Sequence, residues 1–181
     1  MKVLGINGSL RRDSLNLKLL KAAGDYFSEN VEFEILSLGD IPLYNQDLDG
    51  DNKPAAVVNL KQKISDADAL VFATPEFNHS IPGALQNAID WASRPAFNSP
   101  LTGKATGMLS ASMSPIGGAR AQAQLHTVMA SALAPIFPSI EYLLGSAHTV
   151  FDASGAMTDE TAATRLERYI KGFEEWLQQG G

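Results

Sequence analysis

The chain has 181 residues, a formal net charge of −6 at pH 7 and a hydrophobic fraction of 45%. This acidic balance argues against a general nucleic-acid binder and against attraction to anionic membranes. The absence of cysteine excludes disulfides and thiolate catalysis and suits a reducing cytoplasm. No leader pattern and no apolar run of about 18 residues are visible. We therefore expect one cytoplasmic domain over residues 1–181.

Strand and helix patterns alternate along the whole chain. Strands are expected where apolar residues alternate or run without interruption, and helices where they recur every three or four positions. The predicted strands cover residues 2–6, 31–36, 68–74, 104–112 and part of 135–144. The predicted helices run from about 15 to 27, from Pro54 to 65, from 83 to 93, from 119 to 131, and from a cap at Thr158 to about 177.

This alternation predicts an α/β fold with a parallel sheet and helices on both faces. The apolar run at 68–74 is typical of a central strand that is covered on both sides. Five strands in a chain of this length fit a flavodoxin-like, doubly wound sheet with strand order 2-1-3-4-5. In that order, ligands bind outside the carboxyl ends of strands 1 and 3, where loops 8–16, 75–80 and 112–118 converge.

Loop 8–16 has the chemistry of an anion site. The helix that follows offers free backbone N–H groups and the positive end of its dipole. Ser9, Ser14 and Asn16 can add hydrogen bonds to a phosphate, and Arg11 can add a charge-assisted one. The loop lacks the glycine patterns of dinucleotide folds and P-loops. A helix with an ordinary N-cap and an arginine without function would have the same local sequence pattern. The convergence of three polar loops at one edge of the sheet favours a functional site.

The other two loops suit a flat ring. Pro75 stiffens a turn whose backbone N–H groups can face a planar heterocycle, with Phe77 as an apolar cover. Gly117 and Gly118 allow the backbone to approach a ring closely. A phosphate at one end and a flat ring with a polar edge at the other describe a mononucleotide. In a 2-1-3-4-5 sheet, FMN is the leading candidate.

The same residues resemble a known family. The run GSLRRDSLNLKL at 8–19 is similar to the phosphate loop of NAD(P)H-dependent FMN reductases, which include quinone, azo and chromate reductases. The run PEFNHSIPGALQNAIDWASR at 75–94 and the later GGARAQ at 117–122 match the same family. The resemblance implies that the FMN phosphate is held by Ser9, Arg11, Ser14, Leu15 and Asn16. It implies further that Pro75, Glu76, Phe77 and Asn78 touch the isoalloxazine mainly through backbone atoms, and that a segment from Ser112 to Gly117 flanks the ring.

The resemblance also implies the reaction. Hydride would pass from NADPH or NADH to flavin N5 and then to a quinone, an azo or nitro compound or a metal ion, with ping-pong kinetics and no catalytic side chain. No metal-binding motif accompanies the three scattered histidines. A homodimer or homotetramer is implied, with Trp91 and Arg94 near the subunit contact, although core packing of Trp91 is the plain alternative.

Two departures from the family pattern leave alternatives open. Phe77 stands where the family usually has tyrosine, and Met113 stands where glycine or alanine is common. A bulky Met113 can narrow the opening in which nicotinamide or acceptor stacks. The first alternative to an NAD(P)H-dependent oxidoreductase is therefore an FMN electron carrier or redox sensor without NAD(P)H turnover. The second alternative is a binding protein whose site holds no flavin. The physiological acceptor and the preferred nicotinamide stay open.

Overall fold

The computed structural model describes all residues 1–181, and its sheet matches the predicted topology. Five parallel strands lie in the order β2-β1-β3-β4-β5. The strands are β1 (Lys2–Asn7), β2 (Glu32–Ser37), β3 (Ala69–Thr74), β4 (Ala105–Ala111) and β5 (Tyr142–Leu144). The predicted flavodoxin-like α/β fold is therefore confirmed.

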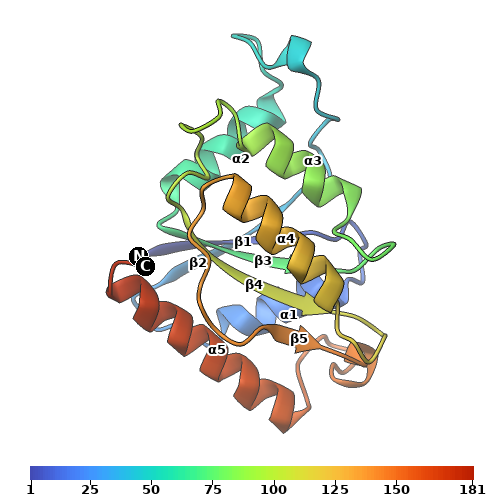
Figure 1. Cartoon of the computed structure of the whole chain (residues 1–181). Helices are drawn as coiled ribbons and strands as arrows, with labels where there is room; N and C mark the ends of the chain where they lie inside the picture. Colours follow the sequence, from blue (N-terminus) through green and yellow to red (C-terminus); the bar gives the residue numbers. More distant parts are fainter.

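Helices cover both faces of the sheet (Figure 1). One face carries α2 (Ala55–Asp66), α3 (Gly83–Ala92) and α4 (Ala119–Ser131), and the other carries α1 (Leu15–Gly24) and α5 (Glu160–Gln178). Alternate residues of β3 feed the two cores: Leu70 and Phe72 pack toward the first face, and Val71 packs toward the second. All of β3 is buried for this reason. None of the helices combines the length and apolarity that a membrane crossing requires.

The last helix begins one residue later than the sequence suggested. Its cap is Asp159, whose carboxylate accepts a hydrogen bond from the Ala162 N–H at 2.7 Å. Thr158 instead donates its hydroxyl to the Val150 carbonyl at 3.1 Å. The expected cap at Thr158 was therefore wrong, because a tertiary contact occupies its hydroxyl.

The fifth strand is short because the chain bulges before it. Ile136 pairs with Thr106, and Tyr142 pairs with Leu109. Six positions on this side thus oppose three on β4, which leaves three extra residues that cannot join the ladder. The bulge lies at the edge of the sheet, and β5 is only three residues long.

The loop between β2 and α2 packs onto α3 rather than onto the three predicted site loops. The Asn87 amide donates to the Pro42 carbonyl at 2.9 Å and accepts from the Tyr44 N–H at 2.7 Å. The Trp91 indole also donates to the Pro42 carbonyl, at 2.8 Å. Trp91 is fully buried within the chain. It therefore packs in the core, which was the alternative to a position at a subunit contact. Arg94 is exposed, with its guanidinium over the Tyr44 ring.

Candidate functional site

The loops after β1, β3 and β4 surround a pocket of about 180 Å³ at the carboxyl edge of the sheet. The strand order reverses between β1 and β3, so the pocket lies at the switch point. Of the predicted site residues, all but Asn78 and Gly117 line it. The complete lining is Ser9, Arg11, Ser14, Leu15, Asn16, Pro75, Glu76, Phe77, Ala111, Ser112 and Met113.

One wall of the pocket is the start of α1. The Ser14 hydroxyl caps this helix by accepting from the Leu17 N–H at 3.2 Å. The N–H groups of Leu15 and Asn16 belong to the first turn and have no partner within the helix. Arg11 is exposed and forms no ion pair with any carboxylate. This wall therefore offers unpaired N–H donors and one free guanidinium to an anion that enters the pocket.

Asn16 uses its side chain in a way that the sequence did not indicate. Its amide donates to the Ala111 carbonyl and accepts from the Ala111 N–H, both at 2.9 Å. The side chain is therefore bonded to the end of β4, while the backbone N–H of the same residue stays available to the pocket.

The second wall ends in a tight hairpin. Phe77 and Ser80 exchange two backbone hydrogen bonds of 3.0 Å, and the two residues between them have positive φ angles of 51° at Asn78 and 63° at His79. This is the geometry of a two-residue type I′ turn, which asparagine adopts readily. Asn78 lies at the tip of the turn, which explains why it does not line the pocket.

Glu76 holds this wall to α4. Its carboxylate accepts from the Arg120 backbone N–H at 3.1 Å and from the Arg120 guanidinium at 3.4 Å, and it lies 3.4 Å from His79 Nδ1. The helix needs this partner because its own cap residue is Gly118, which has no side chain.

The surroundings of Glu76 also set its charge. Burial raises the pKa of Glu76, but hydrogen bonds from the backbone and guanidinium of Arg120 and from the Ala121 backbone outweigh it and lower the pKa below its ordinary 4.5. Glu76 is therefore ionised at neutral pH. An ionised carboxylate that is already bonded is a fixed anion and does not serve as a proton donor.

The third wall is held by a buried network that the sequence analysis did not single out. Ser110 donates its hydroxyl to the Gly117 carbonyl at 2.6 Å, and Gln122 donates to the Ser110 hydroxyl and to the Tyr142 carbonyl, both at 2.8 Å. Gln122 lies within the quoted GGARAQ run, which was the available signal.

Gly117 lies in this wall for a reason other than the one expected. A Cβ on Gly117, whose φ is 69°, would lie 2.9–3.0 Å from the backbone of residues 143–145. The glycine therefore permits packing against β5 and the residue after it, and it does not line the pocket. Met113 does line the pocket and is largely exposed.

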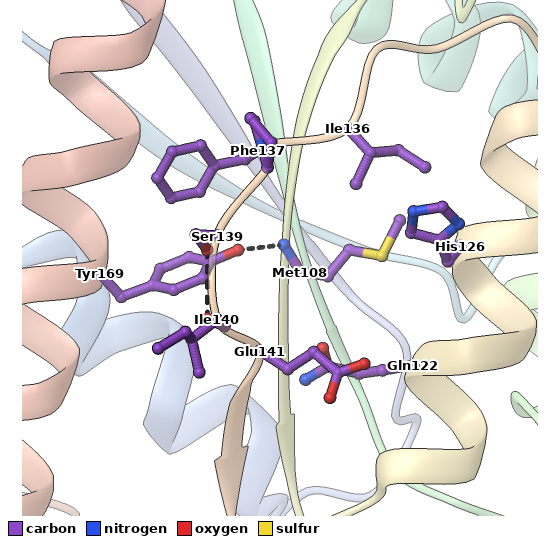
Figure 2. A pocket seen from close by; sticks show the side chains of 10 residues that line it. Met108, Gln122, His126, Ile136, Phe137, Ser139, Ile140, Glu141 and Tyr169 are labelled. Carbon is purple, nitrogen blue, oxygen red and sulfur yellow. Dashed lines mark hydrogen bonds between the residues drawn. The ribbon is translucent and has the colours of Figure 1, made fainter.

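Two larger hollows lie elsewhere on the molecule. A cavity of about 470 Å³ opens beside the bulge, between β4, α4 and α5. Figure 2 shows the Tyr169 hydroxyl inserted there, where it accepts from the Met108 N–H at 2.8 Å and replaces a missing strand partner. Burial raises the pKa of Tyr169 to about 12. A groove of about 560 Å³ runs between α3 and α4. None of the predicted cofactor residues lines either hollow.

Known proteins resemble this chain in sequence and in fold. A family model described as NADPH-dependent FMN reductase matches residues 1–149. An NAD(P)H-dependent FMN reductase of Pseudomonas aeruginosa is 38% identical over 179 residues, which cover 99% of this chain and 96% of that protein. A quinone reductase of Pseudomonas putida is 35% identical over 94% of this chain and 91% of that protein.

The solved structures agree. FerB, a flavoenzyme NAD(P)H:(acceptor) oxidoreductase from Paracoccus denitrificans, has a TM-score of 0.90 and 36% identity over 98% of this chain and 97% of that chain. Sequence, fold and the pocket at the switch point thus lead to one conclusion. The chain is an oxidoreductase that belongs to the NADPH-dependent FMN reductase family.

Proposed function

We propose that this enzyme binds FMN in the pocket at the switch point and uses NADPH or NADH to reduce a small acceptor by a ping-pong mechanism. The observation that carries the proposal is the start of α1, where unpaired N–H groups and the free Arg11 open into a pocket bounded by the β3 and β4 loops. A quinone is the preferred acceptor class, since one relative is named a quinone reductase. Azo compounds, nitro compounds and metal ions are the other acceptors.

The residues present fit a phosphate at one end of the pocket. Ser9, Arg11, Ser14, Leu15 and Asn16 would hold it through hydroxyls, a guanidinium and backbone N–H groups. Pro75, Glu76, Phe77 and Ser112 would contact the ring. Asn78 and Gly117, which do not line the pocket, would act on the ring only through the backbone around them. The proposed cofactor residues stay a prediction until a complex is measured.

The chain itself contributes binding and shielding. When bound, FMN supplies the redox chemistry by accepting a hydride from NAD(P)H and passing reducing equivalents to the acceptor. Phe77, Met113 and Ile116 leave apolar surface exposed on the loops around the pocket. This apolar rim would exclude water and favour a flat, apolar acceptor over a hydrated ion. Glu76, bonded and ionised, keeps the hairpin in place and gives no proton.

The test is an anaerobic titration of FMN-loaded protein. Addition of NADPH, and separately of NADH, should bleach the flavin band within seconds, and a quinone should restore it. Initial velocities at several quinone concentrations should give parallel double-reciprocal lines. Flavin that binds but is not reduced would instead favour an electron carrier or sensor. Failure to retain FMN would favour a binding protein with another ligand.

We also propose that the enzyme is a homodimer whose two subunits contact each other along the groove between α3 and α4. Phe97, 83% exposed, and Leu133 leave apolar surface there, and Arg94 also lines the groove. Sedimentation should report a dimer that the substitution Phe97→Asp weakens. A monomer would contradict the proposal, and a tetramer would require a second contact. A cytoplasmic location and a single domain over 1–181 stay predictions from the sequence.

A further inference from the structure

We propose that Asn16 is a positioning residue, whose side chain sets the spacing between the phosphate end and the ring end of the flavin site. The inference rests on the proposed function, because it concerns how the FMN pocket is held in shape. It differs from the role implied by the sequence, in which Asn16 contacts the phosphate.

The Asn16 amide forms two hydrogen bonds with the backbone of a single residue. It donates to the Ala111 carbonyl and accepts from the Ala111 N–H, at 2.9 Å in each direction, across 95 positions of sequence. Asn16 is only 3% exposed, so water competes little for these bonds. The pair therefore fixes both the position and the orientation of the Ala111 backbone.

Ala111 needs such a partner because the neighbouring strand has ended. The N–H groups of Thr106 and Ser112 point toward the β5 side, where they donate to the Pro135 and Leu144 carbonyls. Strand alternation then turns the backbone groups of Ala111 toward β3. The β3 ladder stops at Thr74, opposite Ser110. The Asn16 amide thus replaces the backbone acceptor and donor that a longer β3 would supply to Ala111.

The two ends of this pair belong to opposite walls of the pocket. Asn16 is the second residue of α1 and lines the pocket, and its backbone N–H lies in the first turn, where it has no helical partner. Ala111 leads directly into Ser112 and Met113, which line the pocket on the other side. The distance from phosphate to ring is set within FMN by its own covalent chain. A site that grips both ends at once must hold its walls at the matching separation.

The molecule contains a matched control in Asn87. Its amide also donates to one backbone carbonyl, that of Pro42, and accepts from one backbone N–H, that of Tyr44, at 2.9 and 2.7 Å. It is 8% exposed, and it does not line the pocket. Asn87→Ala therefore removes the same kind of bond pair without touching the site.

The first experiment compares Asn16→Ala with Asn87→Ala. Both variants should lower the urea midpoint of the protein without flavin by similar amounts. The dissociation constant for FMN should rise roughly tenfold or more in Asn16→Ala and stay within about twofold of wild type in Asn87→Ala. Equal FMN affinity in the two variants would overturn the proposal. If Asn16→Ala does not fold, Asn16→Ser replaces it, because it leaves room for water to bond Ala111.

A second readout separates positioning from direct phosphate contact. Each variant is saturated with FMN, and the visible circular dichroism and reduction potential of the bound flavin are measured. A displaced β4 loop should change both in Asn16→Ala, whereas Arg11→Ala should weaken binding and leave the saturated signals as in wild type. Wild-type signals in saturated Asn16→Ala would overturn the positioning role. Wild-type protein that binds no FMN would refute the proposed function itself, which is a distinct result.

Discussion

Two regions of this molecule are built with the same hydrogen-bond pattern and end up with different roles. In each, a buried asparagine amide holds a distant piece of backbone: Asn16 holds Ala111, and Asn87 holds Pro42 and Tyr44. Around Asn87 the loop is held against α3, because the Trp91 indole also donates to the Pro42 carbonyl and its ring centroid lies 4.8 Å from that of Tyr44. Around Asn16 the first turn of α1 keeps unbonded N–H groups beside an open pocket.

The difference shows that the polar bonds alone do not mark the functional region. What distinguishes the Asn16 region is the set of donors that the fold leaves without partners. In the Asn87 region the amide of Asn87 and the indole of Trp91 bond the loop before α2, so these side chains contribute stability and are not available to the pocket. Mutations in the two regions should therefore separate stability from cofactor affinity.

The largest expected effect comes from a substitution in the region around Asn87. Trp91→Ala removes a fully buried indole and its bond to Pro42, and we expect a loss of about 3–5 kcal/mol of unfolding free energy. Urea unfolding measures the loss. FMN affinity of the molecules that remain folded should be unchanged. A large loss of affinity would mean that the two regions are coupled.

The second largest effect comes from a substitution beside the pocket, in the region around Asn16. Arg11→Ala should weaken FMN binding by about 1.5–3 kcal/mol, because a charge-assisted bond to phosphate is lost. Stability without FMN should not change, since Arg11 is exposed and makes no ion pair. Arg12→Ala is the matched control, because Arg12 is exposed and does not line the pocket. Equal losses in both variants would point to a general charge effect.

A third substitution extends the comparison to the cavity in Figure 2. Tyr169→Phe leaves the Met108 N–H unpaired in a buried place, which should cost about 1–3 kcal/mol of stability and no FMN affinity. The pKa of Tyr169 is raised from 10.0 to about 12, so the neutral hydroxyl stabilises the fold. The difference between wild type and variant should be constant below pH 10.0 and shrink as the pH rises toward about 12. A difference that grew with pH would contradict this assignment.

The smallest effect concerns the cap of α4. Glu76→Gln keeps an acceptor for the Arg120 N–H but loses the charge, so we expect about 0.5–1 kcal/mol less stability at neutral pH. The pKa of Glu76 is lowered from 4.5, so the stabilisation is present above 4.5 and is lost as the pH falls through the lowered pKa. Wild type and variant should converge in acid. A gap that persisted there would show that the charge is not responsible.

The sequence by itself determined the strand order, the helices and the edge at which the pocket lies. Apolar periodicity and the loop residues are local signals, and they place most of the predicted site residues on one pocket. Only the tertiary structure decided what several side chains do there. Asn16 bonds Ala111 across 95 positions, Glu76 caps a helix 44 positions later, and Gly117 packs against the residues around β5. The physical reason is that a polar side chain or a glycine can contact many partners, and only the fold decides which distant backbone comes close enough to bond or pack against it.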